Sequence, residues 1–192
     1  MNPILEELQR MHDDLVVLMK ASSNWKNQKK NIEILNSLAI KEIGESMETD
    51  LVESFAFWMD SEMTGMDTPK PLGCVYFEYD YEDNEALGFG YEVCKPKEGE
   101  VFIKREEYDL EDDTFYDCGG IDISAIVDCE YEEDDSSEFV DLQGFKIAEA
   151  LHYGIKKAIQ SENFTKLVKK NTVYFLIGRH DRWPSLAYLW EK

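Results

Sequence analysis

The sequence predicts a single α+β domain over residues 1–192, in which an antiparallel β-sheet has helices packed on one of its faces. Apolar residues recur at helical spacing near both ends of the chain, whereas the middle third alternates apolar and polar residues as a half-buried sheet does. The chain is 43% hydrophobic and contains no long linker, so its apolar residues can fill one core.

Two helices are expected near the N-terminus. Asn2 is a candidate N-cap, Pro3 suits the first helical position, and apolar residues follow at intervals of three or four. After a polar break at residues 22–24, the apolar spacing predicts a second helix that ends near Gly44. Phe55, Phe57 and Met59 alternate with other residues, which favours a strand over residues 55–59. A helix is the alternative, because the apolar residues at 51, 52, 55 and 59 also have helical spacing.

The middle and the C-terminal part are expected to supply the sheet. Residues 75–81 and 87–93 alternate around turn residues 83–85, which predicts a β-hairpin, and the glycines at 88 and 90 indicate a bulge or close packing. Further strands are expected at 101–106 and within 121–127, with loops at 109–113 and 130–135. A helix then begins at Leu142, with Leu151 and Ile155 on its buried stripe, and residues 173–177 form a buried strand.

Charge excludes several classes of function. The chain has 20 Lys and Arg against 41 Asp and Glu, a formal net charge of -21. Most of the excess lies in residues 71–141, with 24 acidic and 4 basic side chains, whereas residues 142–192 are mildly basic. Such a charge repels phosphate backbones and anionic head groups, so neither direct nucleic-acid binding nor membrane binding is expected. A basic protein is the expected partner.

The acidic middle third interleaves carboxylates with tyrosines. Carboxylates accelerate the encounter with a basic partner, and tyrosines supply rigid contact area once the partner is bound. The alternative is that this surface only keeps the protein soluble. The residues expected to contact the partner are Tyr79, Tyr81, Asp109, Glu111, Asp112, Asp113, Glu132, Glu133, Asp134 and Asp135.

No motif in the sequence predicts a metal site or a cofactor. Asp109, Glu111 and Asp113 alternate as early calcium ligands do, but Thr114 and Gly120 stand where an EF-hand loop needs glycine and glutamate. The four cysteines lack the spacing of a zinc site, so free thiols are expected.

One enzymatic alternative remains open. His180, Asp181 and Arg182 follow the last predicted strand, and strand ends position functional groups well, so a small hydrolase or transferase could use them. The N-terminus lacks the basic start and apolar run of a secretion signal, which predicts a cytoplasmic protein.

The order of elements resembles that of small bacterial immunity proteins, which neutralise toxins. The likeness covers most of the chain and rests on the N-terminal helices, Phe55-Ala56-Phe57-Trp58-Met59-Asp60, the acidic segment, the helix from Leu142 and Val173-Tyr174-Phe175-Leu176-Ile177. It implies an acidic face that covers a cytosolic toxin, often a basic nuclease, and it assigns no role to single residues. The leading prediction is therefore a non-enzymatic cytosolic protein that binds a basic protein.

Overall fold

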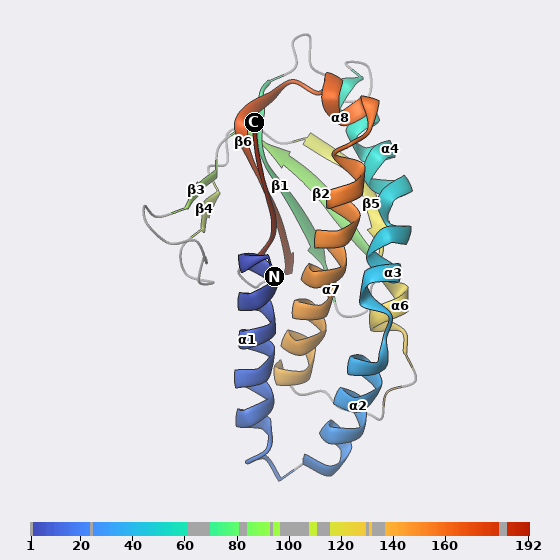
Figure 1. The fold of residues 1–192 in the computed structure, drawn as a ribbon, viewed down its shortest axis with the longest axis vertical. Coiled ribbons are helices and arrows are strands. Elements are labelled where there is room, and N and C mark those ends of the chain that lie inside the picture. Colours follow the sequence, from blue (N-terminus) through green and yellow to red (C-terminus); the bar gives the residue numbers. More distant parts are fainter. Residues whose placement is uncertain are drawn as a thin grey trace.

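The chain folds as a layer of helices against a five-stranded β-sheet, with a separate two-stranded β3–β4 sheet (Figure 1). The computed structural model describes residues 2–23, 25–60, 70–80, 84–92, 94–96, 108–110, 116–129, 131, 137–180 and 184–192. The helices are α1 (Pro3–Met19), α2 (Trp25–Ser37), α3 (Ile40–Ser46), α4 (Glu48–Met59), α6 (Ser124–Val127), α7 (Ser137–Ala158) and α8 (Glu162–Lys166). The strands are β1 (Leu72–Tyr79), β2 (Glu85–Tyr91), β3 (Cys94–Pro96), β4 (Tyr108–Leu110), β5 (Tyr116–Asp122), β6 (Lys169–Arg179) and β7 (Ser185–Glu191). The predicted α+β class is confirmed.

The sheet has the strand order β5-β2-β1-β6-β7 and is mixed. Strands β1 and β2 form the expected antiparallel hairpin, and the β2–β5 register shifts between Leu87 and Gly88, which confirms the bulge. Strands β1 and β6 are parallel, with Val75 beside Phe175, so the expectation of a wholly antiparallel sheet needs correction at this pairing. The chain passes through the long helix α7 before it enters β6, and such a connection lets two parallel strands become neighbours.

The helices cover one face of this sheet, as predicted, and the core lies between the two layers (Figure 1). The rings of Phe55 on α4 and Phe164 on α8 lie 5.1 Å apart between centroids, and Phe175 of β6 lies 6.4 and 6.3 Å from them. Leu151 and Ile155 are fully buried on α7, which confirms the predicted stripe. Helices α1, α3 and α4 all pack against α7.

Helix α1 begins as its sequence predicts. The side chain of Asn2 accepts a hydrogen bond from the Ile4 N–H at 2.8 Å, and Pro3 occupies the first helical position. The second predicted helix is two helices, because α2 ends at Ser37 and α3 begins at Ile40. Gly44 lies inside α3 and allows close packing on α7, since a Cβ at this position would overlap the carbonyl of Ala150.

Residues 55–59 are helical, so the strand favoured for them is wrong. Leu51, Phe55 and Trp58 are buried at spacings of four and three residues, which is the helical reading of the same pattern. A short apolar run cannot distinguish the two readings, and packing against the sheet and α8 decides between them.

Three other predictions are revised or stay untested. The strand expected within 121–127 is β5, which ends at Asp122, followed by the short helix α6. Part of the loop expected at 109–113 lies in β4, and strand β7 was not predicted. The strand expected at 101–106 lies outside the described residues. Cys74 and Cys129 are free thiols, as expected.

Candidate functional site

A groove with an acidic wall runs between helix α4 and the strands β2 and β5, and we call it the α4–β5 groove. Its volume is about 910 Å³. Helix α4 contributes one wall, and the neighbouring ends of β2 and β5 contribute the other. The lining residues are Asp50, Glu53, Ser54, Phe57, Asn84, Glu85, Leu87, Gly119, Gly120 and Asp122.

Helical spacing places the α4 residues on the groove. Asp50, Glu53, Ser54 and Phe57 recur at intervals of three, four and seven residues, so they share one side of the helix. Ser54 is buried at the base of this side, whereas Glu53 is exposed. The packing that makes residues 48–59 a helix therefore also creates one wall of the groove.

Hydrogen bonds tie this wall to β5, an edge strand of the sheet. The Ser54 hydroxyl lies 2.9 Å from the carbonyl oxygen of Asp50 and 3.3 Å from that of Gly119, and it can donate to either. The backbone N–H of Asp122 donates to Oδ2 of Asp50 at 3.3 Å. Side chains of α4 thus form hydrogen bonds with backbone groups of β5. At an open sheet edge, such groups would be available to pair with another strand.

The opposite wall carries two more carboxylates and an apolar side chain. The Glu85 side chain lies over Gly120, because a Cβ on this glycine would overlap it. Oδ1 of Asp122 accepts a hydrogen bond from the Ser124 N–H at 2.8 Å, which holds the start of α6. Leu87 is 48% exposed in the same groove, so apolar contact area accompanies the charges.

The described residues do not compensate the charge of the groove. Among the described residues of its lining are four carboxylates, on Asp50, Glu53, Glu85 and Asp122, and neither lysine nor arginine. Across the part of the chain that the structure describes, no ion pair involves any of the four. Four such negative charges attract a cationic group that reaches the groove.

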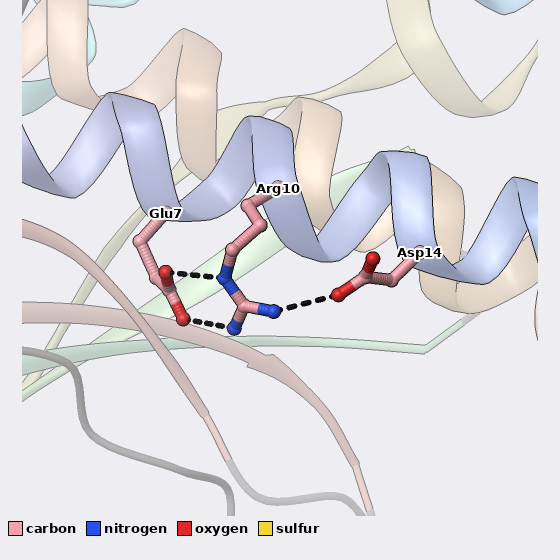
Figure 2. A network of polar contacts seen from close by, with 3 residues as sticks. All are labelled: Glu7, Arg10 and Asp14. Atoms are coloured by element: carbon pink, nitrogen blue, oxygen red, sulfur yellow. Dashed lines mark hydrogen bonds and ion pairs between the residues drawn. The ribbon is translucent and has the colours of Figure 1, made fainter.

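In helix α1, by contrast, two acidic residues form ion pairs with an arginine of the same helix. Figure 2 shows Arg10 between Glu7 and Asp14, one turn away on either side. The Arg10 Nε donates to Glu7 at 2.7 Å, and Nη1 donates to Asp14 at 2.6 Å. The hydrogen bonds from Arg10 lower the pKa of Glu7, and those to Glu7 raise the pKa of Arg10. Two of the four carboxylates of α1 therefore share one cation of the same helix.

The groove carboxylates do not converge on a point. Within the described ranges, no group of three or more His, Cys, Asp or Glu residues is arranged to hold a metal ion. The described helices also include none that is long and apolar enough to cross a bilayer. An extended cationic surface fits the spread of the charges better than a single ion.

Tyr79 belongs to the core, which differs from its expected role as a contact residue. Its side chain is 5% exposed, and its hydroxyl lies beside Gly144 of α7, because a Cβ there would approach Tyr79 Oη to 2.8 Å. The aromatic ring packs with the buried cluster between sheet and helices. Replacing Tyr79 would therefore test stability as well as binding.

Most of the other expected contact residues lie outside the described part of the chain. These are Tyr81, Glu111, Asp112, Asp113, Glu132, Glu133, Asp134 and Asp135. The backbone of Asp109 pairs with that of Lys95 in the β3–β4 hairpin. The role of Asp109 and of these eight residues in partner binding stays a prediction.

The enzymatic alternative centres on His180, at the end of β6. The Nδ1 atom of His180 lies 2.6 Å from Oε1 of Glu78, and its backbone N–H donates to the carbonyl of Tyr79 at 2.8 Å. The imidazole is exposed, and it lines none of the three cavities whose walls the structure describes. Asp181 and Arg182 lie outside the described residues.

Sequence reasoning missed the α4–β5 groove. Asp50 and Glu53 were not singled out, because only residues 55–59 were assigned to an element there and helix α4 was not recognised to begin at Glu48. Glu85 and Asp122 face each other across β2 and β5, a pairing that no sequence spacing reveals. The helical alternative for residues 51–59 was the signal that could have found half of the groove.

Comparison with known proteins yields no relative. No protein-family model, no curated protein and no solved structure matches this chain. The function must therefore be argued from the groove itself.

Proposed function

We propose that the protein is a non-enzymatic cytosolic binding protein that engages a basic protein, and that the α4–β5 groove receives lysine or arginine side chains of that partner. The observation that carries the proposal is a set of four carboxylates in one groove, none of which forms an ion pair with a described residue. In the immunity-type version of this proposal, the partner is a basic toxin whose active surface becomes covered.

The composition of the groove supports a protein partner over a small cation. A volume of about 910 Å³ exceeds the space that one side chain needs, and Leu87 and Phe57 add apolar contact to the charges. Charged groups accelerate association and select a partner of opposite charge, whereas buried apolar contacts slow dissociation. The groove offers both kinds of contact.

The experiment removes two exposed groove charges and compares the result with the removal of two charges elsewhere. The test variant combines Glu53→Gln and Glu85→Gln, and the control combines Glu33→Gln on α2 with Glu191→Gln on β7. All four residues are exposed, and both variants change the net charge equally. Affinity purification from the native cell with the wild-type chain supplies the basic partner.

Association of that partner is then measured at low and at physiological salt. We expect the groove variant to associate about threefold to tenfold more slowly at low salt, because it loses electrostatic attraction at the contact. The control should keep most of the wild-type rate. Equal slowing of both variants would mean that only the total charge matters, and the groove assignment would then be wrong.

A second candidate function rests on the pair formed by His180 and Glu78. A carboxylate 2.6 Å from Nδ1 can orient an imidazole for acid–base chemistry. This alternative predicts that His180→Gln abolishes a hydrolase or transferase activity in a substrate screen while partner association is unchanged. The binding function predicts instead that the groove variant slows association with the partner and that His180→Gln leaves it unchanged.

A further inference from the structure

Strand β7 is the last strand of the chain and one edge of the five-stranded sheet. Within that sheet it is hydrogen-bonded to β6 alone, and the register of this pair shifts between Phe175 and Leu176. Their partners are Tyr188 and Leu186, so Ala187 forms a bulge without a partner in the ladder. An edge strand at the end of a chain can open locally without separating other strands, which makes its opening less costly than that of a central strand.

A buried histidine of α7 contacts this bulge. The Nδ1 atom of His152 lies 2.8 Å from the carbonyl oxygen of Ala187, and it donates to this oxygen because a carbonyl can only accept. The imidazole also packs on the ring of Tyr188, with 5.0 Å between the ring centroids. His152 is 2% exposed, so the strand that it contacts helps to keep water away from it. Opening of β7 would therefore bring this imidazole into contact with water.

The surroundings of His152 disfavour its charged form. Among the described residues, the charged side chains that act on it are Lys156 and Glu149 of α7, and the phenol rings of Tyr153 and Tyr188 lie beside it. Burial has the largest effect and lowers the pKa of His152, and Lys156 lowers it further. Glu149 and the hydrogen bond to the backbone oppose this shift without reversing it. A proton therefore binds more readily once water reaches the ring.

We propose that the contact between His152 and Ala187 is a pH-sensitive switch, which holds β7 on the sheet at neutral pH and favours its local opening on acidification. Neutral His152 donates from Nδ1 and stays buried. Protonation at Nε2 places a charge where β7 excludes water, and opening of β7 relieves this cost by hydrating the ring. The described lining of the α4–β5 groove includes no residue of α7 or β7, so the switch is separate from the proposed binding site.

Hydrogen exchange measured by mass spectrometry reports the local opening of β7. Protection of its backbone amides, corrected for the intrinsic exchange rate, is compared at pH 7.5 and pH 5.5, about one unit on either side of the ordinary histidine pKa. We expect protection of β7 to fall by about threefold to tenfold, the range for a group of pKa near 6.5 that is protonated mainly in the opened state. The other edge strand, β5, should change by less than about twofold. Constant protection of β7, or an equal fall in both strands, would overturn the proposal.

Two variants and one further pH interval separate His152 from other titrating groups. His152→Gln keeps a side-chain donor and removes the titration, so its β7 protection should change by less than about twofold between the same two pH values. His180→Gln is the matched control, because His180 is exposed, and it should keep the wild-type response. The wild type needs no variant between pH 7.5 and pH 8.5, about one and two units above the histidine pKa, where protection should stay constant. A wild-type response in His152→Gln, its loss in His180→Gln, or a similar fall above pH 7.5 would refute the switch.

Discussion

Helix α1 and the α4–β5 groove are both rich in carboxylates, yet they differ in whether these carboxylates form ion pairs. Arg10 pairs with both Glu7 and Asp14 along one face of α1, so these two carboxylates share a cation of their own helix (Figure 2). The groove brings Asp50, Glu85 and Asp122 together from three elements, and none of them forms an ion pair within the described part of the chain. The difference indicates that an acidic surface suggests a binding site only where its charges are left uncompensated.

The largest expected effect tests the core that supports both regions, since α1 and α4 each pack on α7. Leu151→Ala should lower the free energy of unfolding by about 2–5 kcal/mol, because it removes buried atoms and leaves a cavity. Val17→Ala, at an exposed position of α1, is the control and should change it by less than about 0.5 kcal/mol. Denaturant melts measure both, and a loss below about 1 kcal/mol for Leu151→Ala would contradict its place in the core.

The next effect concerns the apolar part of the groove. Leu87→Ala should speed dissociation of the basic partner by about tenfold, near 1.4 kcal/mol, because it removes contact area and little electrostatic attraction. Leu18→Ala on α1 is a suitable control, since Leu18 is also exposed. Surface plasmon resonance separates the two rates. A change confined to the association rate would show that Leu87 lies outside the interface.

A pH dependence comes from the core and must be separated from the surface charges. Burial lowers the pKa of His152, whose Nδ1 lies 2.8 Å from the carbonyl oxygen of Ala187 and donates to it. Lys156 lowers this pKa further, whereas the Ala187 hydrogen bond and Glu149 oppose the shift. The unfolded chain therefore takes up a proton at His152 more readily than the folded chain does.

The direction in which stability changes with pH follows from the difference between the folded and unfolded pKa of His152. Stability from neutral His152 is fully present above the unfolded pKa of about 6.5 and falls as the pH drops below it toward the lower folded pKa. The stability advantage of the wild type over His152→Gln should therefore shrink between pH 7.5 and pH 5.5, about one unit on either side of that pKa. An advantage that grows on acidification, in urea melts of both chains, would contradict this account.

The smallest expected effect is the change in stability when one carboxylate is removed from α1 or from the groove. Glu7→Gln should destabilise the fold slightly, because it breaks a hydrogen-bonded ion pair with Arg10. Glu53→Gln should stabilise it slightly, because it relieves repulsion among groove carboxylates that form no ion pair with a described residue. Melts at 0.01 M and 1 M salt measure both, since the screening length falls from roughly 30 to 3 Å over this range. Effects of the same sign would remove the distinction between the two regions.

Much of the fold followed from local patterns. The Asn2 cap, the hairpin of β1 and β2, the buried stripe of α7 and the strand at 173–177 each depend on the spacing of residues close in sequence. Strand β7 escaped prediction, because residues 185–191 mix apolar and polar side chains without regular alternation. Residues 55–59 of helix α4 were predicted to be a strand, because this apolar run is short enough to satisfy both periods.

Less of the candidate binding surface could be predicted. The amino-acid composition established that the charge is strongly negative and concentrated in the middle third, and this alone argues against ordinary binding to nucleic acid. The described groove nevertheless takes Asp50 and Glu53 from the first third of the chain. The acidic runs that stand out most in the sequence, at 111–113 and 132–135, lie outside the described residues, and their role stays a prediction.

The sequence by itself determined the class of the fold, the places where most helices and strands form, and the sign of the surface charge, because these depend on neighbouring residues and on composition. Only the tertiary structure decided that β1 and β6 lie in parallel, that residues 48–59 are a helix, and that Tyr79 is buried against α7. Among the described residues, it also decided which carboxylates lie together without an ion pair and that the Trp58 indole N–H has no acceptor. These properties arise when residues distant in sequence pack together, since burial and charge compensation depend on every neighbour in space.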